Sequence, residues 1–201
     1  ISRWQASLRP DRVVGVHINM VTAGPPPDLE DPNAGIPAEE LERAQARQEF
    51  FADERGYSNL QGTKPQTLGF GLNDSPAGLA AWIVEKFMTW CDCGDHVENE
   101  FTKDELLTNI TIYWVTGTIT SSTRIYYESR YTPSSRPIGY IDTPVGCAIF
   151  PHEIFIPPRA WAEAAYNVTH WTEMPRGGHF AALEQPELLT DDIRAFFREL
   201  R

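Results

Sequence analysis

Short apolar runs near both ends of the chain indicate buried strands, and the long section between them has helical spacing. Residues 13–20 are β-branched and apolar on both faces, which is typical of a buried parallel strand, and residues 143–150 form a similar run. Residues 168–174 form a third run, which follows a short helix predicted over 159–166. An amphipathic helix is predicted over 186–200. Because strands alternate with helices, the pattern predicts an α/β core around a parallel sheet.

The middle section has the pattern of an all-helical insertion. A helix is predicted over 37–51, where a proline and two glutamates form the first turn. Another is predicted over 76–90, after a capping aspartate or serine. A Thr-x-x-Glu capping box opens a third over 102–116, and a fourth is predicted over 122–131. A helical block between strand regions indicates a cap on an α/β core.

The length of 201 residues is enough for one core with a subdomain, since domains usually contain about 100–200 residues. We expect residues 1–21 to contain the end of a helix and a core strand, 22–136 to form the cap, and 137–201 to complete the core. Because no capping residue precedes the first helix, we expect the chain to be cut at Ile1. The aromatic residues of the cap pack its interior or line an apolar pocket. They include Phe50, Phe51, Trp82, Phe87, Trp90 and Trp114.

Composition narrows the range of partners. A hydrophobic fraction of 41% with 22% charged residues is typical of a folded protein. The formal net charge of −11 argues against nucleic acids and anionic membranes as partners. No apolar run is long enough to cross a bilayer, and the first residues lack a signal-peptide pattern. Three cysteines exclude a fully paired disulfide framework and favour a reducing compartment, so we expect a cytoplasmic protein.

The Cys91-x-Cys93 pair with His96 nearby raises the question of a metal site. Its spacing is tighter than that of common zinc motifs, and no second ligand pair follows. We therefore expect neither a metal ion nor a cofactor.

The main candidate for chemistry is His179, on a glycine-containing turn between the third predicted strand and the final helix. Neutral imidazole moves protons near neutral pH. Glu153 follows the second strand, and functional groups gather beyond the carboxyl ends of parallel strands. We therefore expect Glu153 to orient His179 as a general base. Three alternatives stay open: a structural role for His179, a simple helix-end carboxylate at Glu153, and His152 as the functional histidine.

A nucleophile is the part that this constellation lacks. An α/β hydrolase carries it on a Gly-x-Nuc-x-Gly elbow between a strand and a helix, and no segment of the sequence has that pattern. We expect the elbow to precede Ile1.

Four segments of the chain resemble the microsomal-type epoxide hydrolases, including the juvenile hormone and bacterial members. They are GYSNLQGTKPQT at 56–67, LNDSPAGLAAWI at 72–83, FPHE at 150–153 and RGGHFAA at 176–182. The resemblance extends over nearly the whole chain and matches the C-terminal part of such an enzyme. It implies a partial α/β-hydrolase core with an inserted helical cap.

The resemblance also implies a reaction, in which an epoxide and water give a vicinal diol through a covalent ester. The ester would form on an aspartate expected upstream of residue 1. Glu153 and His179 would be the charge-relay pair, and Tyr57 and Tyr126 would hydrogen-bond the oxirane oxygen. Tyr127 is an alternative to Tyr126. The implied partners are a small apolar epoxide and water, and a homodimer stays open.

Two other interpretations compete with this one. The same fold could serve an esterase or a haloalkane dehalogenase, and a serine at the missing elbow would indicate an esterase. A different class is a catalytically incomplete piece that acts only in binding or structure. Taken alone, the 201-residue chain is expected to be inactive, because it lacks the nucleophile.

Overall fold

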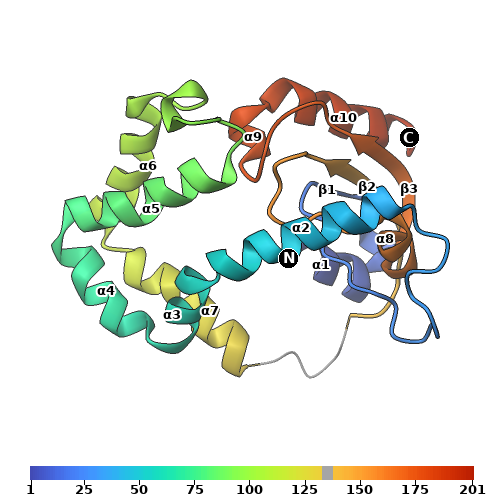
Figure 1. The fold of residues 1–201 in the computed structure, drawn as a ribbon, viewed down its shortest axis with the longest axis horizontal. Helices are drawn as coiled ribbons and strands as arrows, with labels where there is room; N and C mark the ends of the chain where they lie inside the picture. Colours follow the sequence, from blue (N-terminus) through green and yellow to red (C-terminus); the bar gives the residue numbers. More distant parts are fainter. Residues whose placement is uncertain (133–137) are drawn as a thin grey trace. The chain divides into compact units, whose positions relative to one another are not determined.

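The computed structural model describes residues 1–132 and 138–201 (Figure 1). A parallel sheet of three strands, in the order β1-β2-β3, is present as the apolar runs predict. Its strands are β1 (Val16–Ile18), β2 (Ile141–Ile149) and β3 (Tyr166–Glu173). β1 is shorter than the predicted run, because only its three residues pair with β2. The central strand β2 is buried from Val145 to its end, as expected for a strand covered on both faces.

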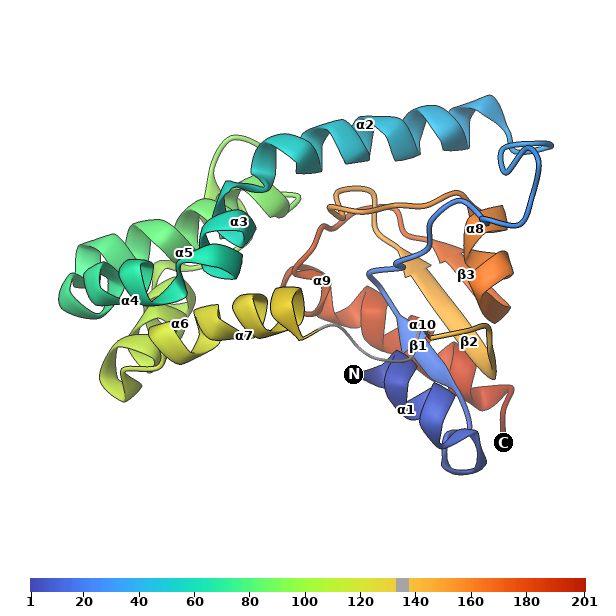
Figure 2. The ribbon, with the colours of Figure 1, turned by 90° about the horizontal axis from the view of Figure 1, so that it is seen from below.

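Helices cover both faces of this sheet (Figure 2). Side chains of a strand alternate between the two faces. Val145 and Cys147 pack in one cluster with α1 (Ser2–Leu8) and α8 (Arg159–Ala165). Ala148, on the other face, packs in a cluster with α9 (Ala181–Glu184) and α10 (Pro186–Arg198). A short 3₁₀ turn, η1 (Pro10–Arg12), leads into β1. These helices agree with the predicted ones except for α9, which is only four residues long.

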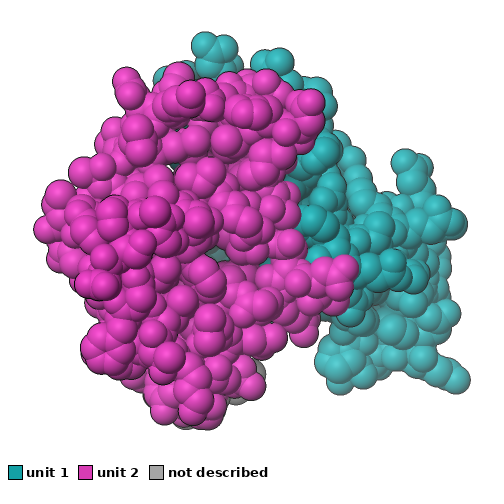
Figure 3. Space-filling model, turned by 60° about the vertical axis from the view of Figure 1, so that its left-hand side comes forward, with its two compact units in different colours: residues 1–51, 136–201 teal, residues 52–135 magenta. Residues whose placement is uncertain are grey.

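Contacts divide the chain into two compact units (Figure 3). Unit 1 contains Ile1–Phe51 and Arg136–Arg201, and unit 2 contains Ala52–Ser135. Most of α2 (Ala38–Glu54) therefore groups with the sheet. The predicted cap boundary between residues 136 and 137 lies outside the described residues, and the three-segment division stays a prediction.

The described part of unit 2 is made of helices and the short segments that join them. They are α3 (Gly56–Thr63), α4 (Pro65–Asp74), α5 (Pro76–Trp90), η2 (Val97–Asn99), α6 (Lys103–Thr116) and α7 (Ile119–Tyr131). The predicted caps are present: Ser75 Oγ accepts a hydrogen bond from Gly78 N, and Thr102 and Glu105 form a reciprocal capping box. No helix in the described residues is long and apolar enough to cross a membrane.

The cysteines differ from the expectation of reduced thiols. Cys91 and Cys93 form a disulfide just after α5, so the two sulfurs considered for a metal site bind each other. Cys147 is free and buried in β2, where burial raises the pKa of its thiol to about 12. An odd number of cysteines excludes complete pairing but allows one disulfide, and here that disulfide joins two cysteines only two positions apart. The cytoplasmic location stays a prediction.

A buried polar cluster joins α10 to both outer strands. Asp192 Oδ2 lies 2.7 Å from His17 Nε2 on β1, and its Oδ1 lies 2.8 Å from His170 Nε2 and 2.6 Å from Thr172 Oγ1 on β3. The ring of Phe196 lies beside both imidazoles. Burial alone would raise the pKa of Asp192, but hydrogen bonds with Thr172, His170 and His17 hold that pKa below its ordinary value.

Asp192→Asn is expected to lower the free energy of unfolding by about 2–4 kcal/mol at neutral pH, because it removes the charge that satisfies these buried partners. A depressed carboxyl pKa contributes stability above its unfolded value of about 3.9 and loses it as the pH falls below that value. Urea unfolding monitored by circular dichroism measures the loss. Asp191→Asn is the control, because that neighbour is exposed and forms a surface ion pair with Arg194, so a change within about 0.5 kcal/mol is expected. Equal effects of the two substitutions would contradict the prediction.

Candidate active site

Two loops of unit 1 meet just beyond the carboxyl ends of β2 and β3. We name them the acid loop, residues 150–154, and the histidine loop, residues 175–180. The amide of His152 donates a hydrogen bond to the carbonyl oxygen of Gly177 (3.1 Å), and His152 and Gly178 form a parallel bridge. The loops are therefore joined through their backbones. This is the edge at which parallel α/β sheets place their functional groups.

The histidine loop depends on a glycine and on a buried carboxylate. Gly177 has a φ of 108°, and a Cβ at this position would lie 2.7 Å from the ring of Phe150. Glu184 of α9 is buried and accepts hydrogen bonds from the amides of Gly178 (2.9 Å) and Phe180 (2.8 Å). These contacts fix the backbone on both sides of His179. Glu184 was not among the predicted site residues, and no sequence motif marks it for these contacts.

Glu153 and His179 form a direct pair. The distance from His179 Nδ1 to Glu153 Oε1 is 2.6 Å, and the same oxygen accepts a hydrogen bond from the amide of Ile154 (2.7 Å). Glu153 is 1% exposed, whereas the His179 side chain is 24% exposed. A carboxylate at Nδ1 favours the tautomer that carries its proton there, so Nε2 has the lone pair that a general base needs. The structure therefore brings together the two residues that the sequence singled out in this region.

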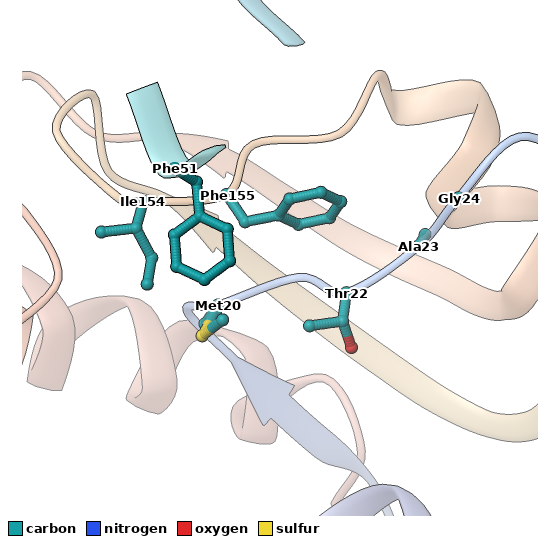
Figure 4. A pocket seen from close by; sticks show the side chains of 7 residues that line it. All are labelled: Met20, Thr22, Ala23, Gly24, Phe51, Ile154 and Phe155. Carbon is teal, nitrogen blue, oxygen red and sulfur yellow. The ribbon is translucent and has the colours of Figure 1, made fainter. Parts of the chain in front are cut away.

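An apolar cavity lies next to the acid loop (Figure 4). It has a volume of about 370 Å³ and includes Met20 and Thr22 from the segment after β1, Phe51 from α2, and Ile154 and Phe155. In Figure 4 the side chain of Phe51 points from its helix toward the segment that carries Met20 and Thr22. Ile154 is the immediate neighbour of Glu153. A cavity with this lining suits a small apolar ligand better than a charged one.

Tyr57 and Tyr126 contact each other within unit 2. Tyr57 lies on helix α3, and Tyr126 lies on helix α7. Their ring centroids are 5.7 Å apart at an interplanar angle of 79°, an edge-to-face contact. Burial, followed by the neighbouring Tyr126, raises the pKa of Tyr57 far above its ordinary value. Tyr57 therefore keeps its phenolic proton and can donate it in a hydrogen bond.

The neighbours of Tyr57 and of Tyr127 show which of the adjacent tyrosines, Tyr126 or Tyr127, faces Tyr57. Trp90 packs edge-on against Tyr57, with centroids 5.1 Å apart, and Lys86 Nζ lies 5.3 Å from the centre of the Tyr57 ring. Tyr127 packs instead on Tyr131, with centroids 4.6 Å apart. Adjacent residues of a helix point in directions about 100° apart, so only one of them can face Tyr57. Tyr126 is the one of the two that contacts Tyr57.

A carboxylate and imidazole pair on loops after adjacent parallel strands, with a helical segment inserted between β1 and β2, is the arrangement of an α/β hydrolase. No protein-family model matches the chain. The chain is, however, homologous to the epoxide hydrolases. It is 47% identical over 153 residues to epoxide hydrolase 1 of the pig, Sus scrofa, a match that covers 71% of this chain and 34% of that protein.

Solved structures agree with this assignment. The juvenile hormone epoxide hydrolase of the silkworm Bombyx mori is 31% identical, with a TM-score of 0.86 over 100% of this chain and 52% of that one. The epoxide hydrolase of Aspergillus niger is 30% identical, with a TM-score of 0.83 over 99% of this chain and 49% of that one. The predicted fold class, a partial α/β-hydrolase core with helices, is thereby confirmed. The chain spans about half the length, or less, of the relatives that it matches.

Proposed function

We propose that the protein containing this chain hydrolyses epoxides to vicinal diols, and that Glu153, His179, Tyr57 and Tyr126 act in the reaction. The observation that carries the proposal is the presence, in a homologue of epoxide hydrolases, of a carboxylate and imidazole pair and also of a pair of phenols. Hydrolases that attack carbonyl groups need the first pair but have no evident use for the second. Opening an oxirane places negative charge on an oxygen, and phenols can stabilise and protonate it.

The proposed reaction has two steps. A carboxylate nucleophile attacks one oxirane carbon, the bond from that carbon to oxygen breaks, and the oxygen takes a proton from a phenol. A covalent hydroxyalkyl ester results. His179 Nε2 then removes a proton from water, which attacks the ester carbonyl and releases the diol and the carboxylate. Glu153 stabilises the imidazolium that forms, and the phenol regains its proton. We propose an aspartate outside these 201 residues as the nucleophile.

The substrate is proposed to be small and apolar, because the cavity beside the acid loop is lined by apolar side chains. Incubation of the full-length protein with an aryl epoxide, followed by chromatographic detection of the diol, tests the function. A p-nitrophenyl ester provides the competing substrate. Diol formation that greatly exceeds ester hydrolysis is expected. Rapid ester hydrolysis without diol formation would contradict the proposal and favour an esterase.

The isolated 201-residue chain is expected to form neither diol nor ester, because the proposed nucleophile is absent from it. Intact-mass spectrometry of the isolated chain after incubation with the epoxide checks this expectation, and an unchanged mass is the expected result. A stable adduct of the mass of one epoxide would contradict it. Any adduct is then treated with alkali, because an ester is hydrolysed whereas a thioether formed at a cysteine survives, so that reaction at a cysteine is not mistaken for ester formation.

A further inference from the structure

One face of helix α2 contacts the rest of unit 1 through polar side chains, in addition to the place of Phe51 in the apolar cavity. The helix contains no buried residue, although 14 of its positions, 38–51, belong to the unit that holds the sheet. Glu40, Arg43 and Arg47 follow one another at spacings of three and four residues, which places them on one side of a helix. Each of them makes a hydrogen bond to a different part of the core.

The three contacts reach different elements. Glu40 Oε2 accepts a hydrogen bond from the amide of Arg159 at the start of α8 (2.8 Å). The guanidinium of Arg43 binds both carboxylate oxygens of Glu173 at the end of β3 (2.9 and 3.2 Å). Arg47 Nη2 donates a hydrogen bond to the carbonyl oxygen of Pro151 (2.7 Å). Of the three, Arg47 is the one that binds the acid loop, two residues before Glu153.

Arg47 also interacts electrostatically with Glu153. Its side chain is partly buried, and burial lowers the pKa of its guanidinium while the charge of Glu153 opposes that change. Arginine nevertheless keeps its positive charge in proteins. Glu153 Oε2 is buried and has no hydrogen-bond partner within residues 1–132 and 138–201. A buried carboxylate is costly unless a cation lies near it, and Arg47 supplies a positive charge at the acid loop.

We propose that Arg47 is a positioning residue for the hydrolysis proposed above: it fixes the acid loop and favours the carboxylate form of Glu153, which orients His179. The inference rests on the proposed function of the pair. Other charged or titratable groups near the pair are His152 in the acid loop, Glu184 of α9 and Arg176 in the histidine loop. The side chain of Arg176 binds Gln185 (2.8 Å), and Glu184 binds backbone amides. Arg47, by contrast, binds the acid loop itself.

Arg47→Met in the full-length protein tests this role, because methionine keeps much of the side-chain volume and removes the charge and the donors. We expect kcat for the epoxide to fall about 10-fold at neutral pH, with KM changed less than about 3-fold. The acid limb of the kcat profile should move to higher pH by about 0.5–1 unit, because loss of a cation favours protonation of the Glu153 and His179 pair. Arg47→Lys keeps the charge, so its acid limb should stay near that of the wild type while kcat falls.

Arg43→Met is the matched control. It removes an arginine from the same face of α2 and breaks the ion pair with Glu173, but it leaves the acid loop untouched. Its acid limb is expected to coincide with that of the wild type. Equal shifts of the acid limb in Arg43→Met and Arg47→Met would show that the effect comes from the docking of α2 in general and not from Arg47. That result would overturn the inference. An unshifted acid limb in a folded Arg47→Met protein would also overturn it.

A second readout does not need epoxide turnover. The pH midpoint of the His179 ring signals can be followed by NMR, with the signals identified by their loss in His179→Gln. We expect this midpoint to move to higher pH in Arg47→Met and to stay in place in Arg43→Met. A wild-type protein that forms no diol would refute the proposed function, whereas the NMR midpoint would still decide the electrostatic role of Arg47. An unmoved midpoint in Arg47→Met would refute that role even if diol formation is intact.

Discussion

His179→Gln is expected to lower steady-state diol formation by the full-length protein by at least about 10³-fold, because glutamine cannot take the proton from the attacking water. The geometry behind this expectation is the 2.6 Å contact of His179 Nδ1 with a fully buried carboxylate oxygen. That contact leaves Nε2 as the basic nitrogen. Chromatographic measurement of the diol at saturating epoxide gives kcat, which reports the ester hydrolysis step when that step is slow.

His152→Gln is the matched control for this substitution. His152 lies beside Glu153 in the acid loop, and its backbone amide, which the substitution keeps, forms the bond to Gly177. Its kcat is expected to stay within a few-fold of the wild-type value. Glu153→Gln, which keeps the size of the side chain but removes its charge, is expected to lose about 10²-fold or more. Loss of activity in His152→Gln with full activity in His179→Gln would reverse the assignment of the base.

Replacing both phenols, in Tyr57→Phe with Tyr126→Phe, is expected to slow ring opening by about 10³-fold. Removal of one donor to a developing oxyanion typically costs about 10²–10³-fold in rate. Because the two rings are in contact, the effects of the single substitutions are not expected to sum to that of the double substitution. Rapid-quench measurement of covalent ester formation isolates this step from the later hydrolysis.

Tyr127→Phe is the control for the phenol pair, since Tyr127 packs on Tyr131 and has the same exposed fraction as Tyr126, 39%. Its rate of ester formation should match that of the wild type within about 2-fold. A strong loss in Tyr127→Phe would move the assignment by one residue. Full ring-opening activity in the double variant would remove the argument that distinguishes this protein from an esterase.

Local signals in the sequence were sufficient for most of the helices and for the parallel sheet. The Thr102 to Glu105 capping box and Ser75 cap their helices as predicted, because these bonds form between near neighbours. Helices α3 and α4 were not predicted, since residues 56–74 include four glycines and a proline that obscure helical spacing. In α4 the glycine at position 69 has a packing reason, because a Cβ there would overlap the side chain of Thr120 on α7.

Of the site in unit 1, only the residues that follow predicted strands could be placed from the sequence. Glu153 and His179 each follow a predicted strand, so the topology of a parallel sheet brings them to one edge. Arg47 gave no such signal, because its partner carbonyl is 104 residues away and an arginine on a polar helix resembles a solvated surface residue. The choice between Tyr126 and Tyr127 likewise required the rotation of α7 relative to α3.

Intact-mass spectrometry of the full-length His179→Gln protein can show whether His179 with Glu153 hydrolyses an ester formed from an epoxide. After a short incubation with excess aryl epoxide, we expect a covalent adduct that adds the mass of one epoxide and disappears under alkaline hydrolysis. The Tyr57→Phe and Tyr126→Phe substitutions in the same protein should slow its formation. An unchanged protein mass with epoxide still present, or diol formation at the wild-type rate, would refute the proposed role of His179.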